Sequence, residues 1–170
     1  MTKLEQLAEL AYREKVEVLY RPLGNHSKGK LIGMYVWDPV APCILLDESL
    51  VNNGRLHTCI LAEEMGHHFS GIRENFTTVE TSLERITVSK DETRAMRWAT
   101  DFLIPDDELL RAVSELKLCS CWELADYFEV TQPFIWKKLG FLRMRSRKMG
   151  IEIHSKDIFI VEMVPYGLAM

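Results

Sequence analysis

A helix predicted over residues 58–70 constrains this chain more than any other segment, because it combines a core-facing apolar stripe with four titratable side chains. Apolar residues recur at the spacing of one helix face, and they are Leu56, Ile60, Leu61, Met65 and Phe69. The titratable residues are Glu63, Glu64, His67 and His68. Residues four apart are neighbours on a helix surface. We therefore expect two acids and two imidazoles along one side of a helix that packs in the core.

This arrangement is close to the zinc-binding pattern His-Glu-x-x-His, in which the two histidines bind the metal and the glutamate acts on the metal-bound water. Glu63 stands where the first histidine would be. In the register that pairs Glu63 with His67, Glu64 falls at the general-base position. In the register that pairs Glu64 with His68, Met65 falls there, and a thioether is not a useful base. The alternative without a metal is a solvated acidic helix edge, with both histidines at the negative end of the helix dipole.

The composition is that of an ordinary globular protein. The chain has 170 residues, of which 47% are hydrophobic and 27% charged, and a net charge of -4. No apolar run approaches the roughly 18 to 20 residues needed to span a bilayer, and the charged start is no secretion signal. We expect a cytoplasmic protein without membrane association and without general affinity for nucleic acid.

The first half predicts an α+β fold. Residues 3–13 have helical periodicity, and strand-like runs follow at residues 16–23, 31–37 and 43–46. We expect an antiparallel sheet, because the connections leave no room for crossover helices, and we expect the helix at 58–70 to pack on it. Residues 72–88 predict a long loop, with a short helix inside it as the alternative, and residues 89–104 predict a second helix that ends before Pro105.

Glu92 extends the buried stripe of this second helix by one turn, so its carboxylate needs a partner. One partner is local, because Ser89-x-x-Glu92 matches a capping box. The other is a metal ion shared with His67, since a catalytic zinc site needs three protein ligands and an open position for water. The spacing alone leaves both alternatives open.

The second half predicts a helix capped by Asp106, a helix-turn-helix over residues 123–139 and a hairpin over residues 151–164. Six cations without an acid lie within residues 137–148, which supports a DNA-binding interpretation. They are Lys137, Lys138, Arg143, Arg145, Arg147 and Lys148. The second helix begins with Phe134, Ile135 and Trp136, which suit packing or protein contact better than base readout. We favour a protein partner and consider direct nucleic-acid binding the lesser alternative.

Two blocks resemble the ImmA/IrrE family of metallopeptidases. They are Leu-Ala-Glu63-Glu64-Met-Gly66-His67-His68 and Glu92-x-x-Ala95-x-x-Trp98-Ala99-x-x-Phe-Leu-Ile-Pro105. The resemblance implies a zincin-like, gluzincin-type core on a phage or mobile element, which cleaves a helix-turn-helix repressor and so releases the genes that it silences. It implies that His67 and Glu92 are metal ligands and that Glu64 is the catalytic base.

The departure at Glu63 has chemical consequences. A carboxylate can bind zinc, so we assign Glu63 as the third ligand, with His68 as a substitute if the helix end unwinds. Two carboxylates and one imidazole make the site less positive and favour harder ions, so zinc is the expected metal and manganese the alternative. We expect residues 1–105 to form the peptidase-like core and residues 106–170 a helix-turn-helix-like module with the hairpin, packed as one domain. The alternative functions are a catalytically impaired regulator that binds a partner, and a DNA-binding regulator.

Overall fold

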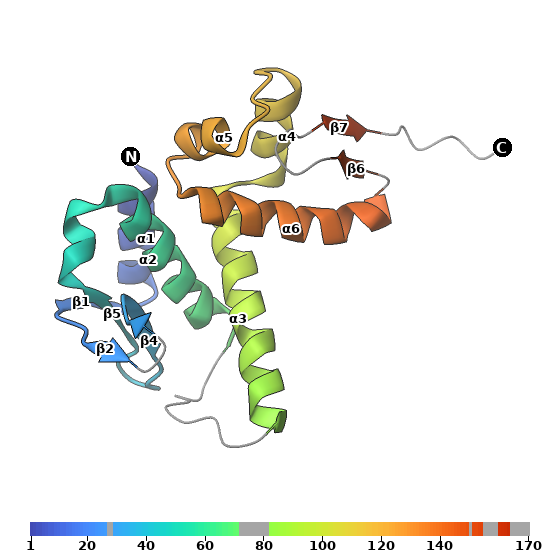
Figure 1. Cartoon of the computed structure of the whole chain (residues 1–170). Coiled ribbons are helices and arrows are strands. Elements are labelled where there is room, and N and C mark those ends of the chain that lie inside the picture. The colour runs from blue at the N-terminus through green and yellow to red at the C-terminus, as the bar shows by residue number, and fades with distance from the viewer. Residues whose placement is uncertain (27–28, 72–81, 150, 155–159, 164–170) are drawn as a thin grey trace. The chain divides into compact units, whose positions relative to one another are not determined.

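The computed structural model describes residues 1–26, 29–71, 82–149, 151–154 and 160–163. The chain forms two compact units, residues 1–99 and residues 100–170. The described residues contain six α-helices and a small three-stranded sheet (Figure 1), so the predicted α+β class is confirmed. In these residues we find no helix with the length and apolar character that a membrane span requires.

The first unit holds the sheet and the predicted site. Its elements are α1 (Lys3–Arg13), β1 (Glu17–Arg21), β2 (Asn25–His26), β3 (Gly29–Lys30), β4 (Gly33–Val36), β5 (Cys43–Asp47), the 3-10 helix η1 (Glu48–Asn52), α2 (Gly54–Phe69) and most of α3 (Ser82–Leu103). Local sequence explains the helix starts, because Thr2 and Glu5 form a capping box on α1 and the Asn53 side chain caps α2. The predicted first helix, the three strand runs and the site helix are confirmed.

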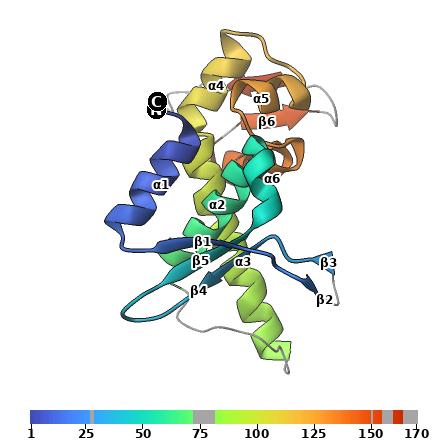
Figure 2. The same ribbon diagram turned by 90° about the vertical axis from the view of Figure 1, so that its left-hand side faces the viewer.

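The order of the sheet is β1-β5-β4 (Figure 2), and here the antiparallel prediction is wrong for one pair. Strands β4 and β5 are antiparallel, with Gly33 opposite Leu46, whereas β1 and β5 are parallel, with Glu17 opposite Cys43. The tight turn after β4 reverses the chain, and β5 then inserts between the two earlier strands. A parallel pair needs a connection that crosses from one end of the sheet to the other, and we had expected only a helix to provide it. Here strand β4 and the β2–β3 hairpin connect β1 to β5.

Helix α2 packs on one face of this sheet, as predicted. Side chains alternate between the two faces of a strand, and the helix-facing residues Ile44 and Leu46 of β5 are fully buried. They pack with Leu61 and Met65 of α2, which are also fully buried. The polar residues of α2 are therefore fixed on a helix whose orientation is set by the core.

Helix α3 is longer than predicted, since it begins at Ser82. The loop prediction for residues 72–88 is therefore wrong over 82–88, and residues 72–81 lie outside the described residues. The predicted stop before Pro105 is confirmed, because α3 ends at Leu103. Its buried residues include Ala95, Ala99 and Leu103, which is the stripe that the sequence indicated.

The second unit contains α4 (Asp106–Ser114), α5 (Cys121–Tyr127), α6 (Gln132–Met149), β6 (Ile151–His154) and β7 (Ile160–Met163). Helices α5 and α6 form the predicted helix-turn-helix, with Ala125, Val130 and Ile135 buried. Glu129 adopts φ 54° at the turn position that glycine usually takes. The antiparallel β6–β7 pair confirms the strands of the hairpin, whereas its predicted turn at residues 155–157 and the side chain of His154 lie outside what is described.

A buried ion cluster ties α6 to the start of the second unit. Lys138 is fully buried, and its Nζ lies 2.6 Å from Asp101 Oδ1 and 2.5 Å from Asp106 Oδ1. Arg145 Nη2 also lies 2.7 Å from Asp101 Oδ1. Asp106 therefore does not cap α4, as we had predicted, because its carboxylate binds these cations and the N-cap position is Pro105. Two of the six cations in residues 137–148 are neutralised inside the fold and do not form part of a basic surface.

Candidate metal centre

The candidate site lies where α2 meets α3, and a glycine sets how closely the two helices approach. Gly66 of α2 is buried, and a Cβ atom added to it would lie 2.2 Å from the carbonyl oxygen of Ala95 in α3. Only glycine allows this approach of two backbones. Close by, the rings of Phe69 and Trp98 stack with their centroids 4.7 Å apart. These contacts hold α3 against the histidine-bearing end of α2.

The same contact brings His67 and Glu92 together. His67 directly follows Gly66, and Glu92 lies one turn before Ala95. The distance from His67 Nε2 to Glu92 Oε2 is 3.4 Å, with the His67 side chain 13% exposed and the Glu92 side chain 54% exposed. Burial alone would lower the pKa of His67, but the hydrogen bond with Glu92 and the charges of Glu64, Glu92 and Glu63 together raise it.

Glu64 is buried between α2 and strand β4, with 8% of its surface exposed. Burial raises the pKa of Glu64 to about 7, and the charge of Glu63 acts in the same direction. The nearby His67 and a hydrogen bond donated by the Tyr35 backbone N–H act in the opposite direction. Glu64 is therefore a carboxyl group that can both accept and donate a proton near neutral pH.

Strand β4 makes the space for this carboxylate. A Cβ atom on Gly33 would lie 2.7 Å from Glu64 Oε1 and 2.5 Å from the Ile60 side chain. We did not predict that Gly33 and Tyr35 belong to the site. The available signal was the glycine itself, because a glycine inside a strand often marks a close approach of another group.

Glu63 contributes charge to the site. It is half-buried, and its carboxylate raises the pKa of both Glu64 and His67. In the described part of the chain, no three or more His, Cys, Asp or Glu side chains are grouped so that they could hold a metal ion. His67 and Glu92 thus form a pair of donor atoms, and the assignment of Glu63 as the third ligand stays a prediction.

The donor pair itself has a spacing that suits zinc. A histidine nitrogen and a carboxylate oxygen each bind zinc at about 2.0–2.2 Å in tetrahedral geometry, which places the two donor atoms about 3.3–3.5 Å apart. The observed separation of His67 Nε2 and Glu92 Oε2 is 3.4 Å. These two side chains could hold such an ion with little rearrangement.

His68 does not share this site. Its Nδ1 lies 3.1 Å from the Tyr35 hydroxyl, and its Nε2 lies 3.7 Å from Oε2 of Glu14, the residue that follows α1. The alternative register, which pairs Glu64 with His68, is therefore not supported by the geometry. His68 instead connects α2 with strand β4 and with the C-terminal cap of α1.

The local alternative for Glu92 is wrong. A capping box acts at a helix N-terminus, whereas α3 begins at Ser82, so Ser89 lies inside the helix. Among the described residues, the titratable side chain that Glu92 meets is His67.

The structure also contains a tyrosine–histidine pair that we did not predict from the sequence. Tyr20 of β1 and the buried His57 of α2 share a hydrogen bond of 2.9 Å between the hydroxyl and Nε2. Burial lowers the pKa of His57. No sequence spacing links the two residues, because they meet only when β1 takes its place in the sheet.

Taken together, the site combines a buried carboxyl group with a pKa of about 7, a nitrogen–oxygen donor pair and the further carboxylate of Glu63. Such a group can bind a cation and can exchange protons with a water molecule beside it. Comparisons with known proteins assign no family to this geometry, because no protein-family model and no curated protein matches the chain.

Proposed function

We propose that this chain is a metal-dependent endopeptidase in which His67, Glu92 and Glu63 hold the metal and Glu64 is the general base. The observation that carries the proposal is the His67–Glu92 donor pair, 3.4 Å apart, beside a buried carboxyl group with a pKa of about 7. The zincin-like core and the resemblance to the ImmA/IrrE family belong to the same proposal. They rest on the two sequence blocks around residues 61–68 and 92–105.

The chemistry follows from the position of Glu64. Zinc, or manganese as the alternative, would polarise the scissile carbonyl and acidify the attacking water. In its ionised form Glu64 would accept a proton from a water molecule beside it, and in its protonated form it would donate that proton to the leaving amine. In the metal-free protein, burial raises the pKa of Glu64 to about 7, so this carboxyl group can exchange a proton near neutral pH. Gly33 and the Tyr35 N–H hold the carboxylate in place.

The substrate that we propose is a helix-turn-helix repressor, whose cleavage releases the genes of a phage or mobile element. The family resemblance supports this substrate, and so does the surface of the second unit. Trp136 is 44% exposed at the start of α6, and aromatic side chains of this kind favour protein contacts. Lys138 is fully buried in its ion cluster, where it cannot reach a phosphate. These features favour a protein partner over DNA.

The first experiment is metal content by elemental mass spectrometry, on protein purified without chelator or an affinity-tag metal. We expect about one zinc or manganese ion per chain. The ion should be lost in His67→Ala and Glu92→Ala and kept in His68→Ala. His68 is the matched control, because it is the adjacent histidine and bonds to Tyr35 instead. An unmodified protein that binds neither metal, even when both are offered, would contradict the proposal.

The second experiment separates catalysis from binding. Glu64→Gln should abolish cleavage of the repressor while metal content and repressor binding are kept. If this variant cleaves at the rate of the unmodified protein, Glu64 is not the base.

The alternative is a regulator on the same scaffold that binds its partner without cleaving it. It is favoured by Glu63, which stands where the His-Glu-x-x-His pattern has its first metal-binding histidine. Glu63→His distinguishes the two, because it restores the His-Glu-x-x-His pattern. A gain of both metal and cleavage in this variant alone would mean that the natural chain is the non-catalytic regulator.

A further inference from the structure

We propose that the open edge of strand β1 is a docking site for an extended segment of a partner protein, which adds to the sheet as a fourth strand. In the sheet order β1-β5-β4, this edge is opposite to β4, the strand against which Glu64 of α2 lies. The proposal therefore does not depend on a metal or on catalysis. It rests on three independent features of the edge.

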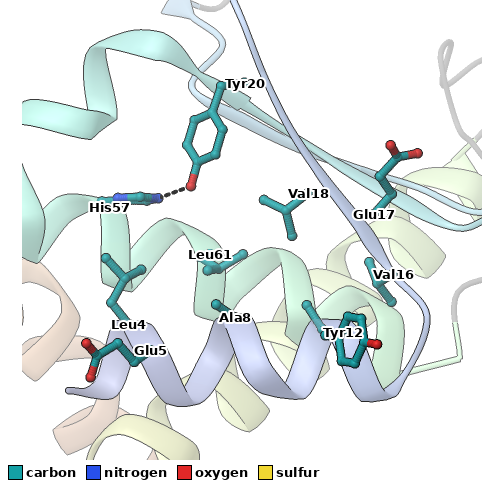
Figure 3. Close-up of a pocket in the computed structure, with 11 residues that line it drawn as sticks. Leu4, Glu5, Ala8, Tyr12, Val16, Glu17, Val18, Tyr20, His57 and Leu61 are labelled. Atoms are coloured by element: carbon teal, nitrogen blue, oxygen red, sulfur yellow. Dashed lines mark hydrogen bonds between the residues drawn. The ribbon is translucent and has the colours of Figure 1, made fainter. Parts of the chain in front are cut away.

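The first feature is a hollow of about 550 Å³ between α1 and β1, with α2 as its floor (Figure 3). Leu4 and Ala8 of α1, Val18 of β1 and Leu61 of α2 line it with apolar surface. Tyr12, at the end of the same α1 stripe, is 84% exposed. An apolar stripe and a strand edge are thus left open side by side.

The second feature is the position of α1 relative to the three strands. Helix α2 packs on β4 and β5, and α1 packs against α2. Packed helices lie about 8–10 Å apart, whereas neighbouring strands are about 4.8 Å apart. The distance between two packed helices is therefore about twice the distance between two neighbouring strands. Since α2 lies over β4 and β5, α1 extends beyond β1 to the position where a further strand would lie. The hollow is the space that the side chains of such a strand would fill.

The third feature is the set of backbone groups at this edge. The Glu17 N–H points towards β5, where it donates to the Pro42 carbonyl over 3.0 Å. Since successive amides of a strand point to opposite edges, the amides of Val18 and Tyr20 face outwards. The Tyr20 carbonyl accepts a hydrogen bond of 2.9 Å from the side chain of its neighbour Arg21, and among the described residues no strand pairs with this edge. Such an edge is a template for strand addition.

The charges of β1 define the partner. Val18 and Tyr20 face the hollow, so the residues opposite them should be apolar. Glu17 and Arg21 lie on the other face at the two ends of the strand. An antiparallel segment with the sequence acid-apolar-x-apolar-base would place opposite charges against both, and such cross-strand pairs are favourable. The partner is therefore an extended segment of this pattern.

The test is amide hydrogen exchange measured by NMR on the full chain, with and without the probe peptide Ser-Glu-Val-Thr-Val-Lys-Ser. In the free protein, the amides of Val18 and Tyr20 should exchange much faster than those of Leu19 and Arg21, which serve as internal controls. About 1 mM peptide should slow Val18 and Tyr20 by about tenfold or more. The peptide Ser-Glu-Ser-Thr-Ser-Lys-Ser, which lacks the apolar residues, should have no effect.

Two variants of exposed positions on α1 locate the site. Ala8→Arg places a large side chain in the hollow and should abolish the slowing, whereas Glu9→Arg, on a residue that does not line the hollow, should leave it intact. Three results would overturn the proposal. They are Val18 and Tyr20 amides that are already as protected as Leu19 in the free monomer, no slowing by the peptide, or protection that appears only on dimerisation.

Discussion

Two groups of charged side chains, one in each unit of the chain, differ in how their charges balance. In the second unit, Lys138 and Arg145 meet Asp101 and Asp106, so two cations face two carboxylates at hydrogen-bonding distances. In the first unit, His67 faces Glu63, Glu64 and Glu92. Three carboxylates therefore act on one imidazole, and we call these four side chains the unbalanced group.

The pKa values record this difference. In the balanced cluster, burial acts to raise the pKa of Asp101, but the hydrogen bonds from Arg145 and Lys138 together lower it. In the unbalanced group, burial and neighbouring carboxylates raise the pKa of Glu64 to about 7. The cations of the balanced cluster keep the Asp101 carboxylate ionised, whereas the Glu64 carboxyl group can exchange a proton near neutral pH. The first arrangement is that of a structural ion cluster, and the second is the one on which the proposed function rests.

The largest effect should come from breaking the balanced cluster. Lys138→Met removes two short contacts between charged groups, but Asp101 and Asp106 are 38% and 39% exposed and still meet Arg145, so the loss should be about 2 to 3 kcal/mol. We expect this loss in the free energy of unfolding, measured with urea. Lys137→Met is the control, because Lys137 is exposed and its replacement should change stability by less than about 0.5 kcal/mol. Equal stability of the two variants would show that the cluster does not hold the unit together.

The next effect concerns the helix contact that assembles the unbalanced group. Gly66→Ala forces a methyl group to within 2.2 Å of the Ala95 carbonyl, so it should destabilise the protein by about 2 kcal/mol. It should also move the pKa of His67, measured by NMR titration, back towards its ordinary value as Glu92 is displaced. Gly140→Ala, in α6 with open space around it, should instead stabilise by about 0.5–1 kcal/mol. A normal His67 titration in Gly66→Ala would mean that helix packing does not create the pair.

The pH dependence of stability should report the unbalanced group directly. Because the pKa of Glu64 is raised in the folded state, its contribution to stability is fully present below about pH 4.5 and is lost as the pH rises to about 7. The raised pKa of His67 acts in the same direction, starting near pH 6.5. From pH 5 to pH 7, metal-free protein should lose on the order of 2 kcal/mol through Glu64. Glu64→Gln should remove that part of the decline, and an unchanged pH profile would refute the assignment.

The smallest effect should come from removing a charge from the unbalanced group. Glu92 is 54% exposed, and its pairing with His67 is partly screened by solvent. Glu92→Gln should change the free energy of unfolding of metal-free protein by less than about 0.5 kcal/mol. It should nevertheless lower the pKa of His67. A loss comparable with that of Lys138→Met would mean that both clusters are structural.

Patterns within one segment were predictable from the sequence. The helix with Glu63, Glu64 and His67 follows from periodicity, and the cap of α5 follows from Ser120-x-x-Glu123, whose reciprocal hydrogen bonds are present. The α+β class and the helix-turn-helix follow from the same rules. All of these features depend on residues a few positions apart.

Features that join distant segments were not predictable. No pattern in the sequence near Lys138 indicates that it pairs with Asp101 and Asp106. We therefore interpreted Lys138 as part of a basic surface, although it belongs to an ion cluster. The space that Gly33 provides for Glu64 depends on strand order, which local periodicity does not encode. The start of α3 was missed because the polar residues of 82–88 carry only a weak apolar stripe. The ion cluster and the space for Glu64 thus depend on long-range contacts, whereas the start of α3 was missed for a local reason.

The parallel pairing of β1 with β5 also has a consequence for how the chain folds. Glu17 meets Cys43 only after the intervening segment has been positioned, whereas α5 and α6 are neighbours in sequence. Local contacts form faster than distant ones, so pulsed hydrogen exchange during refolding should show protection of α5 and α6 before that of β1. The three-stranded sheet, and with it the packing of Glu64 against β4, would then form late. In a newly made chain, the Glu64 carboxyl group would stay solvated until folding is nearly complete.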